Sequence, residues 1–129
     1  MKFIASFGLL LITITACDYK PKNQGKSLYL KHCQSCHMEN GQGLGQLFPP
    51  VSNADYVNIH SDELACIIRY GLEGEITVNG VTYNEAMSGN RQLSDIEIAN
   101  LTYYILKELN DIEKPYSIAE IRLQLDRCK

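Results

Sequence analysis

The sequence contains no tryptophan, and aromatic residues make up only 9% of its 129 residues. A single small domain with so few large side chains has a marginal core of its own. The sequence also lacks a basic patch: 12 basic residues stand against 15 acidic ones, for a formal net charge of −3. This balance argues against nucleic acid as a partner and favours a protein partner with a basic docking face.

The one long apolar run lies at the N-terminus. Lys2 precedes a largely apolar stretch from Phe3 to Ile14, which is too short for an ordinary membrane-spanning helix but typical of an export signal. The stretch leads into Ile14-Thr15-Ala16-Cys17, which resembles the lipobox of bacterial lipoproteins. That resemblance implies cleavage before Cys17 and acylation of this residue.

We therefore expect a lipoprotein signal peptide at 1–16 and a tether at 17–24, with a lipid anchor on Cys17. The mature chain would then lie on the periplasmic side of a bacterial membrane. A plain secretory signal cut near Ala16, which leaves Cys17 as a free thiol, is the alternative. Both interpretations take the domain out of the cytoplasm.

The most specific motif is Cys33-Gln34-Ser35-Cys36-His37. C-x-x-C-H is the attachment signature of c-type haem, in which two thiols bind the haem vinyl groups and the histidine binds the iron. The spacing suits this chemistry because positions i and i+3 lie on one face of a helix. A buried haem would also supply the centre that so small a core lacks.

Two other interpretations of the paired thiols are weaker. A thioredoxin-type C-x-x-C normally follows a strand, and nothing before Cys33 has the pattern of a core strand. A zinc site needs a second ligand pair at finger-like spacing, whereas Cys66 and Cys128 stand alone and far apart.

From about Gly25 to Asn110 the order of motifs resembles the class I cytochromes c. In that family a proline carbonyl accepts the Nδ1 proton of the proximal histidine. Phe48-Pro49-Pro50-Val51 resembles the segment concerned. The resemblance implies that Pro49 is the better candidate for this contact, with Pro50 as the alternative.

The segment Tyr83-Asn84-Glu85-Ala86-Met87-Ser88-Gly89 resembles the loop that carries the family's sixth iron ligand, a methionine. Ser88 stands where a proline is usual. Met38 and His32 adjoin the attachment site and cannot reach the opposite face of a haem, and His60 is the one other candidate. We therefore expect His37 and Met87 as the two metal ligands.

The resemblance implies an all-α fold of three main helices around one covalent haem, with a cytochrome c domain at 25–110. Local patterns add a small β-hairpin and a C-terminal helical extension at 111–129. The first expected element is a helix from Gly25 to His37. Ser61 is expected to cap a second helix, which has Asp62 and Glu63 in its first turn and Leu64 to Tyr70 as its body and which Gly71 ends. A hairpin over Ile76–Tyr83 turns at Asn79-Gly80, a third helix runs from the capping box at Ser94 to Leu109, and a terminal helix from the capping box at Ser117 has Ile118, Ile121 and Leu125 on one face.

Cys66 and Cys128 remain once the haem thiols and Cys17 are assigned. Outside the cytoplasm they could form a disulfide that ties the terminal helix to the helix around Cys66. Two unrelated thiols are the alternative.

These expectations describe an electron carrier, and not an enzyme, whose one covalent haem c cycles between ferrous and ferric states in a respiratory chain outside the cytoplasm. A quinol-oxidising complex would be the donor, and a terminal oxidase or a nitrogen-oxide reductase the acceptor. A haem-based gas sensor or a peroxidase-like enzyme, with a labile sixth ligand, is the alternative.

Overall fold

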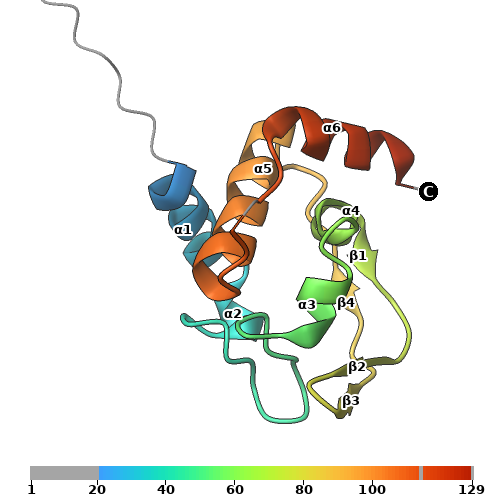
Figure 1. The fold of residues 1–129 in the computed structure, drawn as a ribbon. Helices are drawn as coiled ribbons and strands as arrows, with labels where there is room; N and C mark the ends of the chain where they lie inside the picture. The colour runs from blue at the N-terminus through green and yellow to red at the C-terminus, as the bar shows by residue number, and fades with distance from the viewer. Residues whose placement is uncertain (1–20, 114, 129) are drawn as a thin grey trace, which may run out of the picture.

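The computed structural model describes residues 21–113 and 115–128 (Figure 1). The signal peptide expected at 1–16, the lipidation site Cys17 and tether residues 18–20 lie outside the described residues. In the part of the chain that is described, no helix is both long enough and apolar enough to cross a membrane.

The fold is helical, with two small antiparallel sheets. The helices are α1 (Pro21–His32), α2 (Gln34–His37), α3 (Asp55–Ile59), α4 (Leu64–Tyr70), α5 (Asp95–Tyr103), η1 (Tyr104–Leu109) and α6 (Ile118–Arg127), and the strands are β1 (Gly71–Leu72), β2 (Ile76–Val78), β3 (Val81–Tyr83) and β4 (Met87–Ser88). Helix α1 begins at Pro21, four residues before the expected start at Gly25. Proline is tolerated there because the backbone N–H groups in the first turn of a helix have no intrahelical acceptor, so the N–H that proline lacks costs no hydrogen bond.

Helix α1 crosses α5 and η1 at very close range (Figure 1). A Cβ atom added to Gly25 would lie 2.6 Å from Cβ of Tyr104 and would also overlap the carbonyl oxygen of Asn100. One turn along α1, the ring of Tyr29 packs on that of Tyr104 with 5.6 Å between centroids. The absence of a side chain at Gly25 therefore lets the first and last helices of the domain touch backbone to backbone.

The capping box predicted at Ser94 is confirmed, because Ser94 and Glu97 each satisfy the other's backbone N–H. The helix then departs from expectation at its C-terminal end, where residues 104–109 form a π-helical turn instead of regular α-helix. Asn110 ties this wide turn, since its side-chain amide donates to the carbonyls of Ile105 at 2.9 Å and Val51 at 2.7 Å.

Helix α4 covers the predicted body, Leu64–Tyr70, and ends at Gly71, whose φ is 87°. The first turn predicted at Asp62 and Glu63 is not part of the helix. The predicted cap is wrong: α4 starts after Glu63, and no side chain caps it. The hydroxyl of Ser61 instead lies 3.3 Å from the hydroxyl of Tyr116, in the segment before α6. A contact between residues far apart in sequence has thus replaced the local one.

The predicted hairpin is confirmed. Strands β2 and β3 pair through Ile76–Tyr83, Thr77–Thr82 and Val78–Val81. Asn79 and Gly80 form the turn with φ values of 51° and 78°, as a two-residue type I′ turn requires. A second sheet was not expected: β1 continues directly from α4 and pairs with β4.

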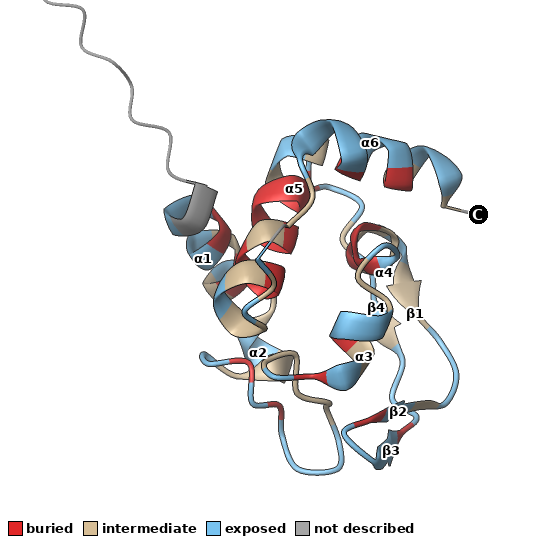
Figure 2. Ribbon diagram, in the orientation of Figure 1, coloured by how far each residue is buried: buried red, intermediate tan, exposed pale blue. Residues whose placement is uncertain are grey.

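Helix α6 lies across α5 and α4 (Figure 1), and Ser117 opens it with the predicted capping box. Figure 2 shows that most of α6 is exposed and that its buried positions face the domain. Those positions are Ile121 and Gln124, whereas Ile118, expected on the same face, is 39% exposed. A disulfide joins Cys128, just after α6, to Cys66 in α4.

Candidate functional site

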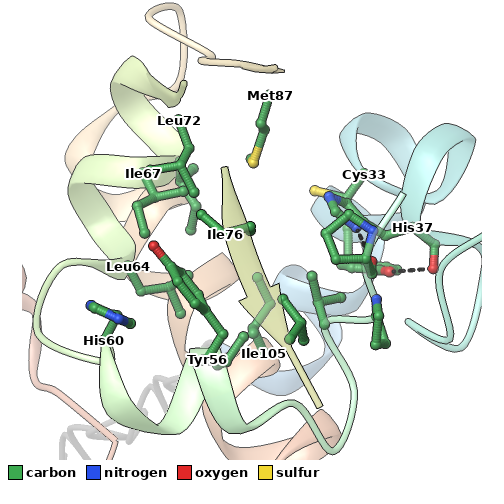
Figure 3. A pocket seen from close by; sticks show the side chains of 17 residues that line it. Cys33, His37, Tyr56, His60, Leu64, Ile67, Leu72, Ile76, Met87 and Ile105 are labelled. Carbon is green, nitrogen blue, oxygen red and sulfur yellow. Dashed lines mark hydrogen bonds between the residues drawn. The ribbon is translucent and has the colours of Figure 1, made fainter. Parts of the chain in front are cut away.

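A largely apolar cavity lies between α1–α2 on one side and α3, α4 and β2 on the other (Figure 3). The empty space between these walls, including the part open to solvent, is about 660 Å³. Its aliphatic lining consists of Val51, Val57, Leu64, Ile67, Ile68, Leu72, Ile76, Val78 and Ile105. A neighbouring cavity shares Cys33, His37 and Met87 and adds Cys36, so the two form one crevice.

The two thiols of the C-x-x-C-H motif lie at one end of this crevice. Cys33 follows α1, and the backbone N–H of His37 donates to the Cys33 carbonyl at 2.9 Å, so the motif forms one helical turn. Neither Cys33 nor Cys36 is in a disulfide. Both thiols are therefore available to bind neighbouring positions on one edge of a planar group.

The imidazole of His37 points into the crevice (Figure 3). Its Nδ1 lies 2.9 Å from the carbonyl oxygen of Pro49. Burial lowers the pKa of His37, while the hydrogen bond to Pro49 acts in the opposite direction. A neutral ring that donates Nδ1–H to a carbonyl keeps its lone pair on Nε2, where it is available to a metal.

The Pro49 carbonyl is held in place by a close backbone approach. A Cβ atom added to Gly43 would lie 2.5 Å from the carbonyl oxygen of Phe48 and 2.6 Å from the carbonyl carbon of Pro49. The backbone N–H of Gly43 also donates to the carbonyl of His37 at 3.0 Å. Gly43 therefore links the histidine to the segment that orients its ring.

Tyr29 supports the same turn from α1. Its side chain is fully buried, and its hydroxyl donates to the carbonyl of Met38 at 2.9 Å. Burial raises the pKa of Tyr29, so this hydroxyl remains protonated and a donor. No local sequence pattern indicates this hydrogen bond, which joins residues nine apart.

Met87 enters the crevice from a different side, and its sulfur points into the space that His37 also faces (Figure 3). The sequence predicted a loop here, but Met87 begins β4, which pairs with β1. An imidazole nitrogen and a thioether sulfur are a ligand pair that proteins use for haem iron. The thiols, the histidine, the methionine and the aliphatic walls thus all fit a covalently bound haem.

Two polar residues near the crevice, His60 and Arg69, have partners of their own. His60 lines the edge of the cavity, where its ring stacks on Tyr56 at 4.2 Å and its Nδ1 lies 3.3 Å from a Glu63 carboxylate oxygen. Arg69 forms an ion pair with Asp95 at 2.7 Å. Tyr56 was missed because no local pattern in the sequence distinguishes it.

The alternative interpretations of the thiol pair gain no support. Among the described residues, no three His, Cys, Asp or Glu side chains converge as a metal site. Burial, with a smaller contribution from nearby Cys36, raises the pKa of Cys33 to about 11. A nucleophilic thiol of the thioredoxin type needs a lowered pKa, so these surroundings favour the opposite protonation state.

The family model for cytochrome c matches residues 23–108. The chain belongs to the cytochrome c family. Its cofactor is therefore covalently bound haem c, and its role is electron transfer. The match runs from α1 into η1, and α6 lies outside the matched residues.

Relatives of this cytochrome include a cytochrome c-552 of Thermus thermophilus, 34% identical over 108 residues that cover 76% of this chain and 81% of the relative. A second Thermus thermophilus cytochrome c-552 has the same identity over 72% of its length. The cytochrome c subunit of a quinone alcohol dehydrogenase from Gluconobacter oxydans is 32% identical over 88 residues, 66% of this chain and 18% of that protein.

Proposed function

We propose that this cytochrome is a one-haem electron carrier in which His37 and Met87 are the two axial ligands of the iron. Cys33 and Cys36 would form the thioether bonds. The observation that carries the proposal is that the His37 ring and the Met87 sulfur point into one crevice from different sides (Figure 3). The bound haem supplies a reversible one-electron step at its iron.

Neighbouring residues orient the two proposed iron ligands and keep water and substrates away from the iron. The Pro49 carbonyl accepts the Nδ1 proton of His37, which fixes the ring and makes its other nitrogen a better donor. Met87 would hold the iron as the second protein ligand, so that no coordination site would be left for a substrate. The aliphatic walls of α4 and β2 keep water away. The protein is then a carrier and not an enzyme.

The setting that we propose is the periplasmic side of a bacterial membrane, with the mature chain anchored through lipid on Cys17. The Cys66–Cys128 disulfide supports a compartment that permits thiol oxidation. Anchoring would raise the effective concentration of the carrier near membrane-bound partners.

The redox partners would be a quinol-oxidising complex as donor and a terminal oxidase or a nitrogen-oxide reductase as acceptor. The match to a cytochrome c subunit of a quinone alcohol dehydrogenase supports participation in redox complexes. The acidic net charge favours a basic docking face on the partner.

The test of the ligand pair is a reduced-minus-oxidised visible spectrum of the full chain matured with haem, extended to the near-infrared band of methionine bound to ferric iron. We expect sharp α and β bands together with the near-infrared band. Met87→Leu should abolish that band, whereas the matched variant Met38→Leu should keep it. A high-spin spectrum that changes on addition of carbon monoxide or peroxide would overturn the proposal in favour of a sensor or peroxidase-like protein.

The anchor is tested by fractionating cells that express the wild type and Cys17→Ser. Haem-containing wild-type protein should sediment with membranes, and the variant should not carry acyl chains when its mature N-terminus is analysed by mass spectrometry. An unacylated wild-type N-terminus would contradict the lipid anchor and leave the haem assignment intact.

A further inference from the structure

Met87 does not project from a free loop. Strand β4 pairs with β1 in the register Gly71–Ser88 and Leu72–Met87. Two residues further on, the backbone N–H of Asn90 donates to the carbonyl of Ile68 in α4 at 2.8 Å. The segment that carries Met87 is therefore attached along the C-terminal end of α4 and its continuation.

Two glycines make this attachment close, one on each side. A Cβ atom added to Gly89 would lie 2.5 Å from the backbone nitrogen of Gly71 and 2.6 Å from the carbonyl oxygen of Arg69, and it would overlap the carbonyl carbon of Tyr70. All three are backbone atoms, so no side chain could rotate to make room. The backbone itself would have to move.

Gly71 makes the same close backbone contact from the other side. An added Cβ there would lie 2.8 Å from the backbone nitrogen of Gly89 and would overlap the carbonyl oxygen of Met87. Its φ of 87° also belongs to a region that side-chain-bearing residues rarely adopt. The two segments thus touch backbone to backbone beside the residue that bears the sulfur.

Helix α4, which leads into Gly71, is held firmly in the domain. Leu64, Ala65 and Ile68 of α4 are buried. Arg69 holds Asp95 of α5 at 2.7 Å, and Cys66 is disulfide-bonded to Cys128. Helix α4 also supplies part of the crevice wall, so a segment attached to its end has a fixed position relative to the haem pocket.

We propose that Gly71 and Gly89 are positioning residues for the sixth iron ligand: their backbone contact fixes the position of the Met87 sulfur over the crevice. This inference rests on the proposed ligation by Met87. A side chain at position 89 would move β4 away from α4 and weaken the sulfur–iron bond, while leaving the haem attached at Cys33 and Cys36.

The test compares wild type, Gly89→Ala and Gly45→Ala, each as the full chain matured with haem. Gly45 is the control because an added Cβ there meets nothing within 4 Å, and the strain that alanine meets at its φ of 55° works against the expected difference. The readouts are the near-infrared band and the affinity of the ferric protein for imidazole, which competes with methionine. In Gly89→Ala we expect a weakened or lost band and imidazole binding about tenfold tighter, since apparent affinity scales with the fraction of protein whose sixth position is open.

Wild-type behaviour of Gly89→Ala, or an equal change in Gly45→Ala, would overturn the positioning role while the Met87 assignment stands. Absence of the band in wild type would overturn the ligation and the inference together. If Gly89→Ala does not incorporate haem, amide hydrogen exchange of the wild type tests the proposal instead. The Asn90 amide should then be protected from exchange by its hydrogen bond to the Ile68 carbonyl. Exchange of that amide at the rate of an unstructured loop would overturn the proposal without any variant.

Discussion

Gly25 of α1 rests directly against the backbone carbonyl of Asn100 in α5, with no space for even one methyl group between the two helices. This contact sets the separation of the first and last helices of the cytochrome c domain. The Tyr29–Tyr104 ring contact and the hydrogen bond from Tyr29 to the turn after His37 lie next to it. The helix crossing and the haem-attachment turn are thus parts of one packed unit.

Gly25→Ala should therefore destabilise the protein. Alanine would gain about 1 kcal/mol of helix propensity over glycine, but forcing apart two backbones costs more, for a net loss of roughly 2 kcal/mol. The measurement is the free energy of unfolding in denaturant. Lys26→Ala, at an exposed neighbouring position on α1, is the control and should change that free energy by less than about 0.5 kcal/mol. A Gly25→Ala protein at least as stable as wild type would contradict this packing.

Gly43→Ala should raise the reduction potential. The added methyl group would push on the Phe48–Pro49 backbone and lengthen the hydrogen bond from His37 to the Pro49 carbonyl. A weaker acceptor makes the imidazole a poorer electron donor, which favours ferrous over ferric iron. The potential is measured by redox titration of the α band. Gly45→Ala, in the same loop and also at positive φ, should leave the potential unchanged; an equal shift in both variants would point to general loosening of the loop.

Removal of the disulfide should destabilise the chain without removing the haem. The two cysteines are 62 residues apart, and on the chain-entropy model closing such a loop is worth about 4 kcal/mol. The double variant Cys66→Ser, Cys128→Ser should unfold at lower denaturant concentration and retain its visible spectrum. Reductant should bring wild type to the level of the variant and have no further effect on the variant. Equal stability of oxidised wild type and variant would show that the bridge contributes nothing.

Acid should weaken the two capped helices. Hydrogen bonds from the Ser94 backbone and hydroxyl lower the pKa of Glu97, and those from the Ser117 hydroxyl and backbone lower the pKa of Glu120. Because each folded-state pKa lies below the ordinary value of 4.5, the stabilisation is complete above that pH and is lost as the pH falls through the lowered pKa.

The measurement is the free energy of unfolding as a function of pH for wild type and for Glu97→Gln with Glu120→Gln. The gap between the two proteins should be largest above pH 4.5 and should close below it. Glu39→Gln, at an exposed position outside the helices, is the control for the loss of a surface carboxylate that caps no helix. A gap that widens in acid would contradict the assigned direction.

Structural features that depend on a few neighbouring residues could be predicted from the sequence. Each capping box, at Ser94 and at Ser117, joins residues three apart, and the Asn79-Gly80 hairpin pairs residues at most seven apart, so their hydrogen bonds depend on little else. The C-x-x-C-H turn is similarly local. Order along the chain was enough to suggest Met87, but not the strand that holds it.

The features that were missed depend on contacts between distant segments. Strands β1 and β4 have two residues each, too few for any periodic pattern, and they exist because Gly71 and Gly89 let distant backbones meet. Ser61 lost its predicted cap to a contact with Tyr116. The buried face of α6 is set by the disulfide and by packing on α4 and α5, which brings Gln124 inward and leaves Ile118 exposed.

The Cys66–Cys128 disulfide also determines which fragments a single cleavage of the backbone would produce. It closes a covalent ring that contains Met87, whereas Cys33 and His37 lie outside the ring. Residues 73–75, between β1 and β2, are exposed and are a natural target for a protease. Cleavage there would leave both pieces joined through sulfur, with Cys33 and His37 on one piece and Met87, the proposed second iron ligand, on the other.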